Sequence, residues 1–237
     1  MTSFFGACKD LIFPAYCLHC DRRLPSWRVP LFCEECLADI GHIGPPCCTC
    51  CGLPFPGGKD HLCDQCLVKP YAFTLARAAV LYKNPVSSVI SDFKFNGQLT
   101  GLPTLAGLAK NSIGFHELSE PDIILPVPLH AQRLRERGFN QAAALAHAIF
   151  KENKRKITPS LLVRKRATTP QTALNGKQRR RNLFGAFSVK QPEMVQGKKI
   201  LLVDDVFTTG STVNECARTL NKYDAKQVEV FTLCKAL

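Results

Sequence analysis

The positions of apolar and polar residues predict an α/β domain from residue 71 onward. The run ILLV at 200–203 predicts a strand of a parallel sheet that is buried on both faces, because neither face shows a polar side chain. Longer stretches with an apolar face predict helices, and a proline opens one of them at residue 85. We expect strands at 76–82, 122–127, 161–163, 200–203 and 227–234, and helices at 85–95, 99–115, 140–150 and 213–220.

Two acidic residues follow the apolar run at 200–203. Asp204 and Asp205 are expected at the carboxyl end of that strand, which is where open α/β sheets bind ligands. The helix predicted at 213–220 begins shortly afterwards, so its N-terminal amides and dipole can hold a phosphate. Hydroxyl side chains surround a glycine between the acids and that helix: Thr208, Thr209, Gly210, Ser211 and Thr212. Carboxylates that accept hydrogen bonds from ribose hydroxyls, next to a phosphate loop, predict a sugar-phosphate site.

Two other interpretations of this stretch are less favoured. An ordinary strand, loop and helix can carry a hydroxyl-rich N-cap, but such a turn has no need of two acids before its hydroxyls. A P-loop nucleotide site is disfavoured because the string G-x-x-x-x-G-K-[ST] occurs nowhere in the chain.

Thirteen cysteines are present, and eleven of them lie before residue 67. Two C-x-x-C turns supply four thiolates to one tetrahedral ion, and four thiolates leave no open position, so such sites are structural. Four C-x-x-C turns therefore predict two structural zinc sites, with eight ligands: Cys17, Cys20, Cys33, Cys36, Cys48, Cys51, Cys63 and Cys66.

The register of the third turn is open, since Cys47 and Cys50 also fit the spacing. We favour Cys48 with Cys51, because Gly52 follows and glycine eases a tight turn. Which turns share an ion is also open: sequential pairing is the simplest arrangement, and interleaved pairing is geometrically possible.

The composition indicates the cellular compartment of the protein and the charge of its partner. No run of eighteen apolar residues occurs, so no membrane span is expected. Lys9 and Asp10 interrupt the apolar residues of the N-terminus, so we expect no secretory signal, no disulfide framework and a cytoplasmic protein. The net charge is +12, and residues 151–181 hold eleven basic residues and one acid. This density predicts an anionic partner, either diphosphate or nucleic acid, and a solvated basic loop is the alternative.

Basic residues also follow the strand predicted at 122–127. Pro128 stops that strand, Arg133, Arg135 and Arg137 come next, and Asn140 is expected to cap the following helix. We expect this turn to lie beside the loop that follows Asp204. No hydrophobic period runs through 168–181, so we expect a flexible basic surface loop at about 164–182.

Several motifs in one order carry a family resemblance. They are the paired C-x-x-C turns, PVPLH followed by RLRERGFNQ, RKRATTPQTALNGKQRRRNLFGAF, and VDDVFTTGST. The last string resembles the phosphoribosyl-pyrophosphate (PRPP) loop of type I phosphoribosyltransferases, and nearly the whole chain resembles the ComF/GntX family. The resemblance implies a double zinc-ribbon module at 1–70 and a type I phosphoribosyltransferase core with a parallel sheet at 71–237.

The resemblance also implies roles for particular residues. Asp204 and Asp205 are the implied catalytic pair, which holds the ribose hydroxyls and helps to place Mg²⁺. Together with these acids, the implied PRPP contacts are Val206, Thr208, Thr209, Gly210, Ser211 and Thr212. The implied diphosphate or anion contacts are Pro128, Arg133, Arg137, Arg164, Lys165, Arg166, Arg179, Arg180 and Arg181.

Two functions of different class follow. The favoured one is a PRPP-binding protein of DNA uptake and natural transformation, which handles single-stranded DNA in the cytoplasm together with other DNA-uptake proteins. The alternative is an active phosphoribosyltransferase that moves ribose 5-phosphate from PRPP to an unknown nucleobase or other acceptor. Each has a weakness, because few residues follow the last strand to form a base-selecting hood, and residues 168–181 offer no aromatic ring for stacking.

Overall fold

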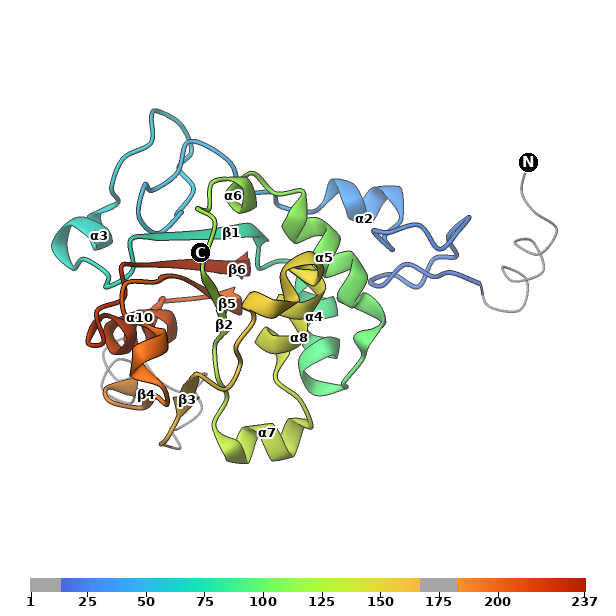
Figure 1. The fold of residues 1–237 in the computed structure, drawn as a ribbon. Helices are drawn as coiled ribbons and strands as arrows, with labels where there is room; N and C mark the ends of the chain where they lie inside the picture. The colour runs from blue at the N-terminus through green and yellow to red at the C-terminus, as the bar shows by residue number, and fades with distance from the viewer. Residues whose placement is uncertain (1–13, 167–182) are drawn as a thin grey trace.

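A computed structural model describes residues 14–166 and 183–237. Its centre is a parallel sheet of four strands in the order β1-β6-β5-β2 (Figure 1). A short antiparallel pair, β3 with β4, lies beside it. The strands are β1 Leu75–Leu81, β2 Ile123–Pro126, β3 Leu162–Arg164, β4 Phe187–Val189, β5 Lys199–Phe207 and β6 Gln227–Lys235. The parallel sheet and its four strands confirm the predicted fold class.

Helices cover both faces of this sheet. The α-helices are α2 Glu34–Ala38, α3 Asp64–Val68, α4 Val86–Phe95, α5 Leu102–Lys110, α6 Ile113–His116, α7 Ala131–Arg137, α8 Gln141–Ile149 and α10 Ser211–Asn221. Short 3₁₀ helices occupy η1 Leu99–Gly101, η2 Lys151–Lys156 and η4 Pro192–Met194. No helix within 14–166 or 183–237 has the length and apolar character of a membrane span.

Alternate residues of the strands enter two separate cores. On β5, Leu201 and Val203 face the core that contains residues of α4, α5 and α8, while Ile200 and Leu202 face the core that contains residues of α10. Side chains of a strand alternate between faces, so an apolar run of this kind fits a sheet that is covered on both sides. Figure 1 shows α10 well separated from α4, α5 and α8.

The stretch predicted as one helix at 99–115 is in fact η1, α5 and α6. The break comes at Asn111, where α5 ends, and Ser112, which takes an extended backbone. The Ser112 hydroxyl accepts a hydrogen bond from the Phe115 amide at 3.3 Å. A serine that caps a new helix competes with continuation of the old one, which explains the error.

Strand β5 is longer than the predicted run at 200–203. It continues through both acids to Phe207, because β6 offers pairing partners along the same length: Asp204 pairs with Thr232 and Phe207 with Lys235. The acids therefore lie in the last part of the strand, and the loop before α10 is only residues 208–210.

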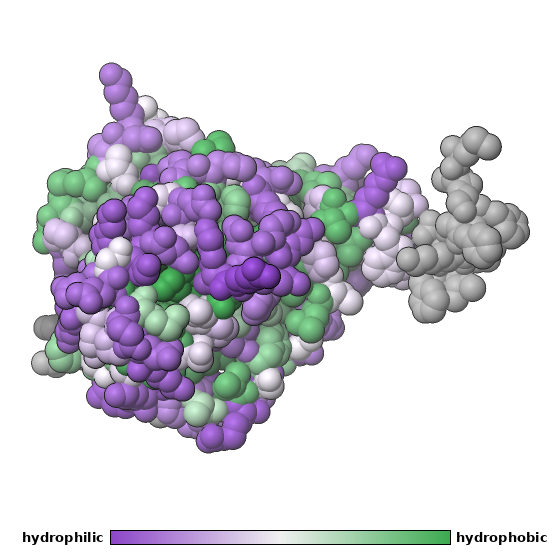
Figure 2. Space-filling view, in the orientation of Figure 1, coloured by the Kyte–Doolittle hydropathy of each residue, from purple (hydrophilic) through white to green (hydrophobic). Residues whose placement is uncertain are grey.

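The predicted basic loop at 164–182 is described only at its start. Arg164 is the last residue of β3 and pairs with Phe187, so it belongs to a strand rather than to a loop. Residues 167–182, which include Arg179, Arg180 and Arg181, lie outside the described residues, and the loop there stays a prediction. The face of the molecule in Figure 2 is largely hydrophilic, with apolar side chains in small separate groups.

Candidate functional site

A cavity of about 430 Å³ opens where β2 and β5 end. Pro128 and Leu129 from the turn after β2 line it beside the acids of β5, so the predicted neighbourhood of these two segments is confirmed. The residues predicted to bind PRPP all line the cavity except Thr209, whose hydroxyl lies 2.8 Å from that of Ser211. The lining includes Asp204, Asp205, Val206, Thr208, Gly210, Ser211 and Thr212.

The two acids differ in their surroundings. Asp205 forms an ion pair with Lys94, with 2.9 Å between Nζ and Oδ2. Asp204 accepts a hydrogen bond from the backbone amide of Asp205 at 2.9 Å. Burial, together with the neighbouring Asp205 charge, raises the pKa of Asp204 to about 7. Lys94 relieves only part of the repulsion between these two close carboxylates. The pair therefore suits a cation or hydroxyl donors as ligands.

The loop between β5 and α10 has the geometry of an anion site. Gly210 caps α10 in the left-handed region, with φ of 66°, and an eleven-residue helix follows it. The first amides of a helix have no intrahelical acceptor, so they can bind an oxyanion. A Cβ on Gly210 meets the ring of Phe207 at 2.5 Å, so glycine is required both by the backbone angle and by this contact.

Gly210→Ala is therefore expected to distort the loop and weaken phosphate binding at this site. Gly185 is the matched control, since it has the same φ of 66° and a Cβ there would meet no atom within 4 Å. Alanine at either position costs about 1–2 kcal/mol for its left-handed backbone. Only Gly210→Ala is expected to lower PRPP affinity, measured by calorimetry. Equal affinity of both variants contradicts the assigned role of the loop.

Arginines form another part of the cavity wall. Arg133 and Arg137 lie one turn apart on α7, so they share a face of the helix and both line the cavity. Arg164 reaches it from β3. Burial lowers the pKa of Arg137, and burial together with the Arg133 charge lowers the pKa of Arg164. Cations that repel one another in a partly buried wall favour an anionic ligand.

Two of the predicted anion contacts do not line this cavity. Lys165 and Arg166 follow β3 and are absent from the lining, although Arg166 donates a hydrogen bond to the carbonyl of Phe184 at 2.9 Å. The Lys165 amide donates to the carbonyl of Ala186 at 2.8 Å, so the chain after Arg164 still runs beside the segment that precedes β4.

The sequence interpretation missed several lining residues. They are Tyr82, Lys94, Phe95, Asn140 and Gln141. Phe95 is 76% exposed at the end of α4, and the Arg137 guanidinium lies 5.4 Å from the centre of its ring. Tyr82 is 38% exposed. Asn140 and Gln141 end the motif RLRERGFNQ, but no motif marks Tyr82, Lys94 or Phe95, which only tertiary structure brings to the acids. Tyr82 and Phe95 supply exposed aromatic rings, which residues 168–181 lack.

The eight predicted cysteines form two groups. In each group the sulfur atoms lie within 4.8 Å of one another, and pairing is sequential: the first cluster is Cys17, Cys20, Cys33 and Cys36, and the second cluster is Cys48, Cys51, Cys63 and Cys66. Sulfur distances of 3.6 Å, 3.7 Å and 3.8 Å within them match the separation of about 3.8 Å that four zinc bonds of about 2.3 Å impose in a tetrahedron. Neither Cys47 nor Cys50 belongs to a cluster.

Backbone amides prepare one thiol of the second cluster for a metal. The amides of Cys51 and Cys63 each donate to the Cys48 sulfur at 3.4 Å. Burial alone raises the pKa of this thiol, but these amides and that of Cys50 lower it to about 6. Deprotonated thiolates are the form that binds zinc.

Comparison with known proteins identifies relatives that match nearly the whole chain. The DNA utilization protein YhgH of Shigella flexneri is 36% identical over 96% of this chain and 100% of its own length. Competence protein F of Haemophilus influenzae is 33% identical over 93% of this chain and 96% of its own length. The chain belongs to the ComF/GntX family. Competence protein ComFC of Bacillus subtilis is 25% identical over 93% of this chain and 95% of its own length.

Two domain models match separate parts of this ComF/GntX protein. The double zinc ribbon domain matches residues 8–67, which contain both cysteine clusters. The phosphoribosyl transferase domain matches residues 135–237, which contain the acids of β5 and the loop before α10. The ComF/GntX chain therefore combines a double zinc ribbon with a phosphoribosyltransferase domain.

Proposed function

We propose that this ComF/GntX protein binds PRPP with Mg²⁺ in the cavity at the carboxyl ends of β2 and β5, and handles single-stranded DNA in the cytoplasm. The observation that carries the proposal is the meeting of three groups in one cavity: the acid pair, the Gly210 loop and the arginines of α7 and β3. Each group suits a different part of PRPP. Retention of PRPP by the zinc-loaded protein in equilibrium dialysis tests this half of the proposal.

In this proposal the parts of PRPP have separate partners. Asp204 and Asp205 accept hydrogen bonds from the ribose hydroxyls, and the first amides of α10 hold the 5′-phosphate. Arg133, Arg137 and Arg164 face the diphosphate. The acid pair fits Mg²⁺, because burial and then the charge of Asp205 raise the pKa of Asp204, and a dication would relieve the repulsion between the two carboxylates. Mg²⁺ held there would neutralise charge on the diphosphate.

The DNA half of the proposal rests on charge, aromatic exposure and the names of the relatives. The net charge of +12 attracts a polyanion. Phe95 and Tyr82 at the cavity provide ring faces on which bases can stack. The relatives are named for DNA utilization and competence, and we extend that role, together with contacts to other DNA-uptake proteins, to this chain.

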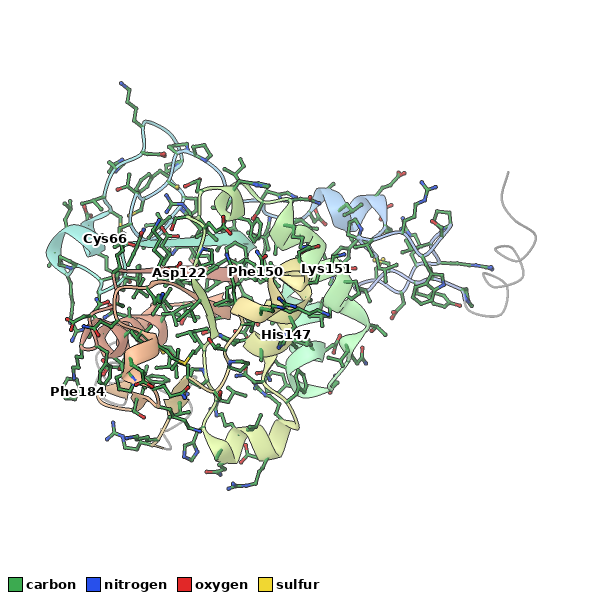
Figure 3. The ribbon with its side chains drawn as sticks, in the orientation of Figure 1. Cys66, Asp122, His147, Phe150, Lys151 and Phe184 are labelled. Atoms are coloured by element: carbon green, nitrogen blue, oxygen red, sulfur yellow. The ribbon has the colours of Figure 1, made fainter. Side chains whose placement is uncertain are left out.

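Phe95→Ala is expected to weaken binding of a short oligothymidylate about tenfold, because stacking on one ring contributes about 1–3 kcal/mol per base. Phe184 is the matched control, since it is 67% exposed, lies beside α10 and β4 (Figure 3), and is absent from the residues that line the cavity. Fluorescence anisotropy of a labelled oligonucleotide measures both variants. Equal losses in the two variants, or no loss in either, contradict stacking at the cavity.

We also propose that each cysteine cluster holds one structural zinc ion. The fit of the sulfur distances to a tetrahedron supports this proposal. Residues 1–70 are then a zinc-binding module, and residues 71–237 carry the PRPP site.

The match to the phosphoribosyl transferase domain over 135–237 favours a second candidate function, transfer of ribose 5-phosphate to an acceptor. In that reaction the bond between C1′ and the diphosphate breaks and a bond to the acceptor forms. Release of pyrophosphate from PRPP and Mg²⁺ in the presence of each nucleobase tests this candidate. Acceptor-dependent release supports transfer, and a binding role predicts none.

A further inference from the structure

The two cysteine clusters lie in different cores. Cysteines of the first cluster pack in the core with residues of α4, α5 and α8, whereas all four cysteines of the second cluster pack in the core with residues of α10. In Figure 1 the helices α2 and α3, which each contain one cysteine of a different cluster, lie far apart. The clusters therefore contact different parts of the phosphoribosyltransferase domain.

We infer that the second cluster positions the phosphate loop, residues 208–210, through Lys235 and Tyr71. The inference deepens the proposed function, on which it depends for the identity of the ligand. Two separate chains of contacts connect the cluster to the loop, and they meet at Phe207, the last residue of β5.

The first connection runs through a buried lysine at the end of β6. The Lys235 ammonium donates a hydrogen bond to the carbonyl of Cys51 at 2.9 Å. The same ammonium lies 3.9 Å from the centre of the Phe207 ring, which is a cation–π contact. Phe207 in turn lies against Gly210, where a Cβ has no room. A displacement of Cys51 is therefore transmitted through two side chains to the glycine of the loop.

The second connection runs through a tyrosine between the cysteine module and β1. Gln65, which lies between Cys63 and Cys66, donates a side-chain hydrogen bond to the hydroxyl of Tyr71. That hydroxyl donates to the backbone carbonyl of Thr209 at 3.1 Å. The rings of Tyr71 and Phe207 meet edge to face, with centroids 6.1 Å apart. The short helix α3 of the second cluster is thus connected, through the Tyr71 hydroxyl, to the backbone of the loop at Thr209.

The buried ammonium of Lys235 needs a negative charge nearby, and the second cluster can provide it. The side chain is only 3% exposed, and no carboxylate lies within ion-pair distance of it in the described part of the chain. A buried ammonium is costly unless a negative charge accompanies it. Four thiolates around one zinc ion would carry a net charge of about −2, and that charge would lie close to Lys235, whose ammonium donates to the carbonyl of the ligand residue Cys51. Loss of the cluster leaves a buried cation without compensation beside the loop.

The contacts of the first cluster lead elsewhere. His19, between Cys17 and Cys20, lies 2.9 Å from the Ser88 hydroxyl of α4. The amide of Leu31 donates to the Thr104 hydroxyl of α5 at 3.0 Å. Neither of these contacts reaches residues 208–210, so the two clusters are expected to differ in their effect on the loop.

The test uses Tyr71→Phe and Lys235→Met in the full-length, zinc-loaded protein. Tyr71→Phe removes one hydroxyl and keeps the ring, and Lys235→Met keeps an unbranched stem without the charge. Tyr16→Phe is the control, because Tyr16 is exposed near the first cluster. Three readouts are needed: zinc per chain, hydrogen exchange of the amides at 208–212, and affinity for PRPP with Mg²⁺.

Tyr71→Phe and Lys235→Met are expected to retain two zinc ions, exchange their loop amides faster, and bind PRPP about threefold to tenfold more weakly, as the loss of one hydrogen bond implies. The amides of residues 200–203 should exchange as in the wild type. Unchanged loop exchange in Tyr71→Phe, or the same acceleration in Tyr16→Phe, overturns the inference. If the variants exchange their loop amides faster but the wild type binds no PRPP, the connection between the second cluster and the loop is supported and the proposed function is rejected.

Discussion

Asp204→Asn combined with Asp205→Asn is expected to weaken PRPP binding at least about a hundredfold, because hydrogen bonds to charged groups contribute about 1.5–3 kcal/mol each and two carboxylates are lost. Asparagine keeps the shape of the side chain but carries no charge and cannot attract Mg²⁺. Folding and zinc content should be retained, since neither acid is a member of a cysteine cluster. Calorimetric titration with PRPP and Mg²⁺ measures the effect.

The single variant Asp204→Asn should also change how stability depends on pH. Burial and Asp205 raise the pKa of Asp204 from 3.8 to about 7, so the folded state holds this proton longer than the unfolded state. The wild type therefore loses stability as the pH rises from about 4 through about 7, and the variant lacks this loss. At pH 8 we expect the variant to be more stable by a few kcal/mol, at about 1.4 kcal/mol for each unit of pKa.

Asp39→Asn is the control for both measurements, because Asp39 is exposed and lies at the end of α2, where it does not line the cavity. It should bind PRPP and unfold as the wild type does. Undiminished PRPP affinity of the double variant contradicts the assignment of the acid pair. A stability that falls equally with pH in Asp204→Asn and in the wild type contradicts the assigned state of Asp204.

Cys48→Ser is expected to remove one zinc ion and most of the soluble, folded protein. Structural zinc contributes about 10–16 kcal/mol of folding free energy in small zinc domains, which is comparable to the whole net stability of a typical protein, about 5–15 kcal/mol. The four cysteines of this cluster are buried in the core next to α10, so their loss affects the sheet as well as the ribbon. Atomic absorption and thermal unfolding measure the result.

Cys47→Ser provides a close control for this experiment. Cys47 is the preceding residue in the chain and is also buried, but it belongs to neither cluster. It should keep two zinc ions per chain and lose only the modest stability expected of a polar change in a core. Two zinc ions and normal unfolding in Cys48→Ser, or loss of zinc in Cys47→Ser, contradict the assigned ligands.

Much of the fold could be predicted because its determinants are local. The strand at 200–203 is apolar at every position, as burial on both faces requires. The cysteine clusters follow from fixed spacing, since a C-x-x-C turn places two sulfurs on one side of an ion. The predicted helix cap at Asn140 is confirmed, because its side chain accepts from the amide of Ala142 at 3.0 Å.

Other features depend on residues that are distant in the chain. Lys94 pairs with Asp205 because α4 packs near the end of β5, and no local pattern marks a lysine of a helix as a partner of that acid. Strand β5 outlasts its apolar run because β6 pairs with it up to Lys235. Phe95 and Tyr82 reach the cavity only through the packing of β1 and α4. Such contacts are tertiary, so hydrophobic periodicity does not contain them.

The most direct test of the central claim is calorimetric titration of the zinc-loaded protein with PRPP and Mg²⁺, alone and with single-stranded DNA present. We predict that PRPP binds, and that DNA changes its affinity, because the aromatic rings and the phosphate loop belong to one cavity and coupling between ligands is reciprocal. Absence of PRPP binding to protein that carries two zinc ions contradicts the claim. PRPP binding that DNA leaves unchanged contradicts a shared surface for the two ligands.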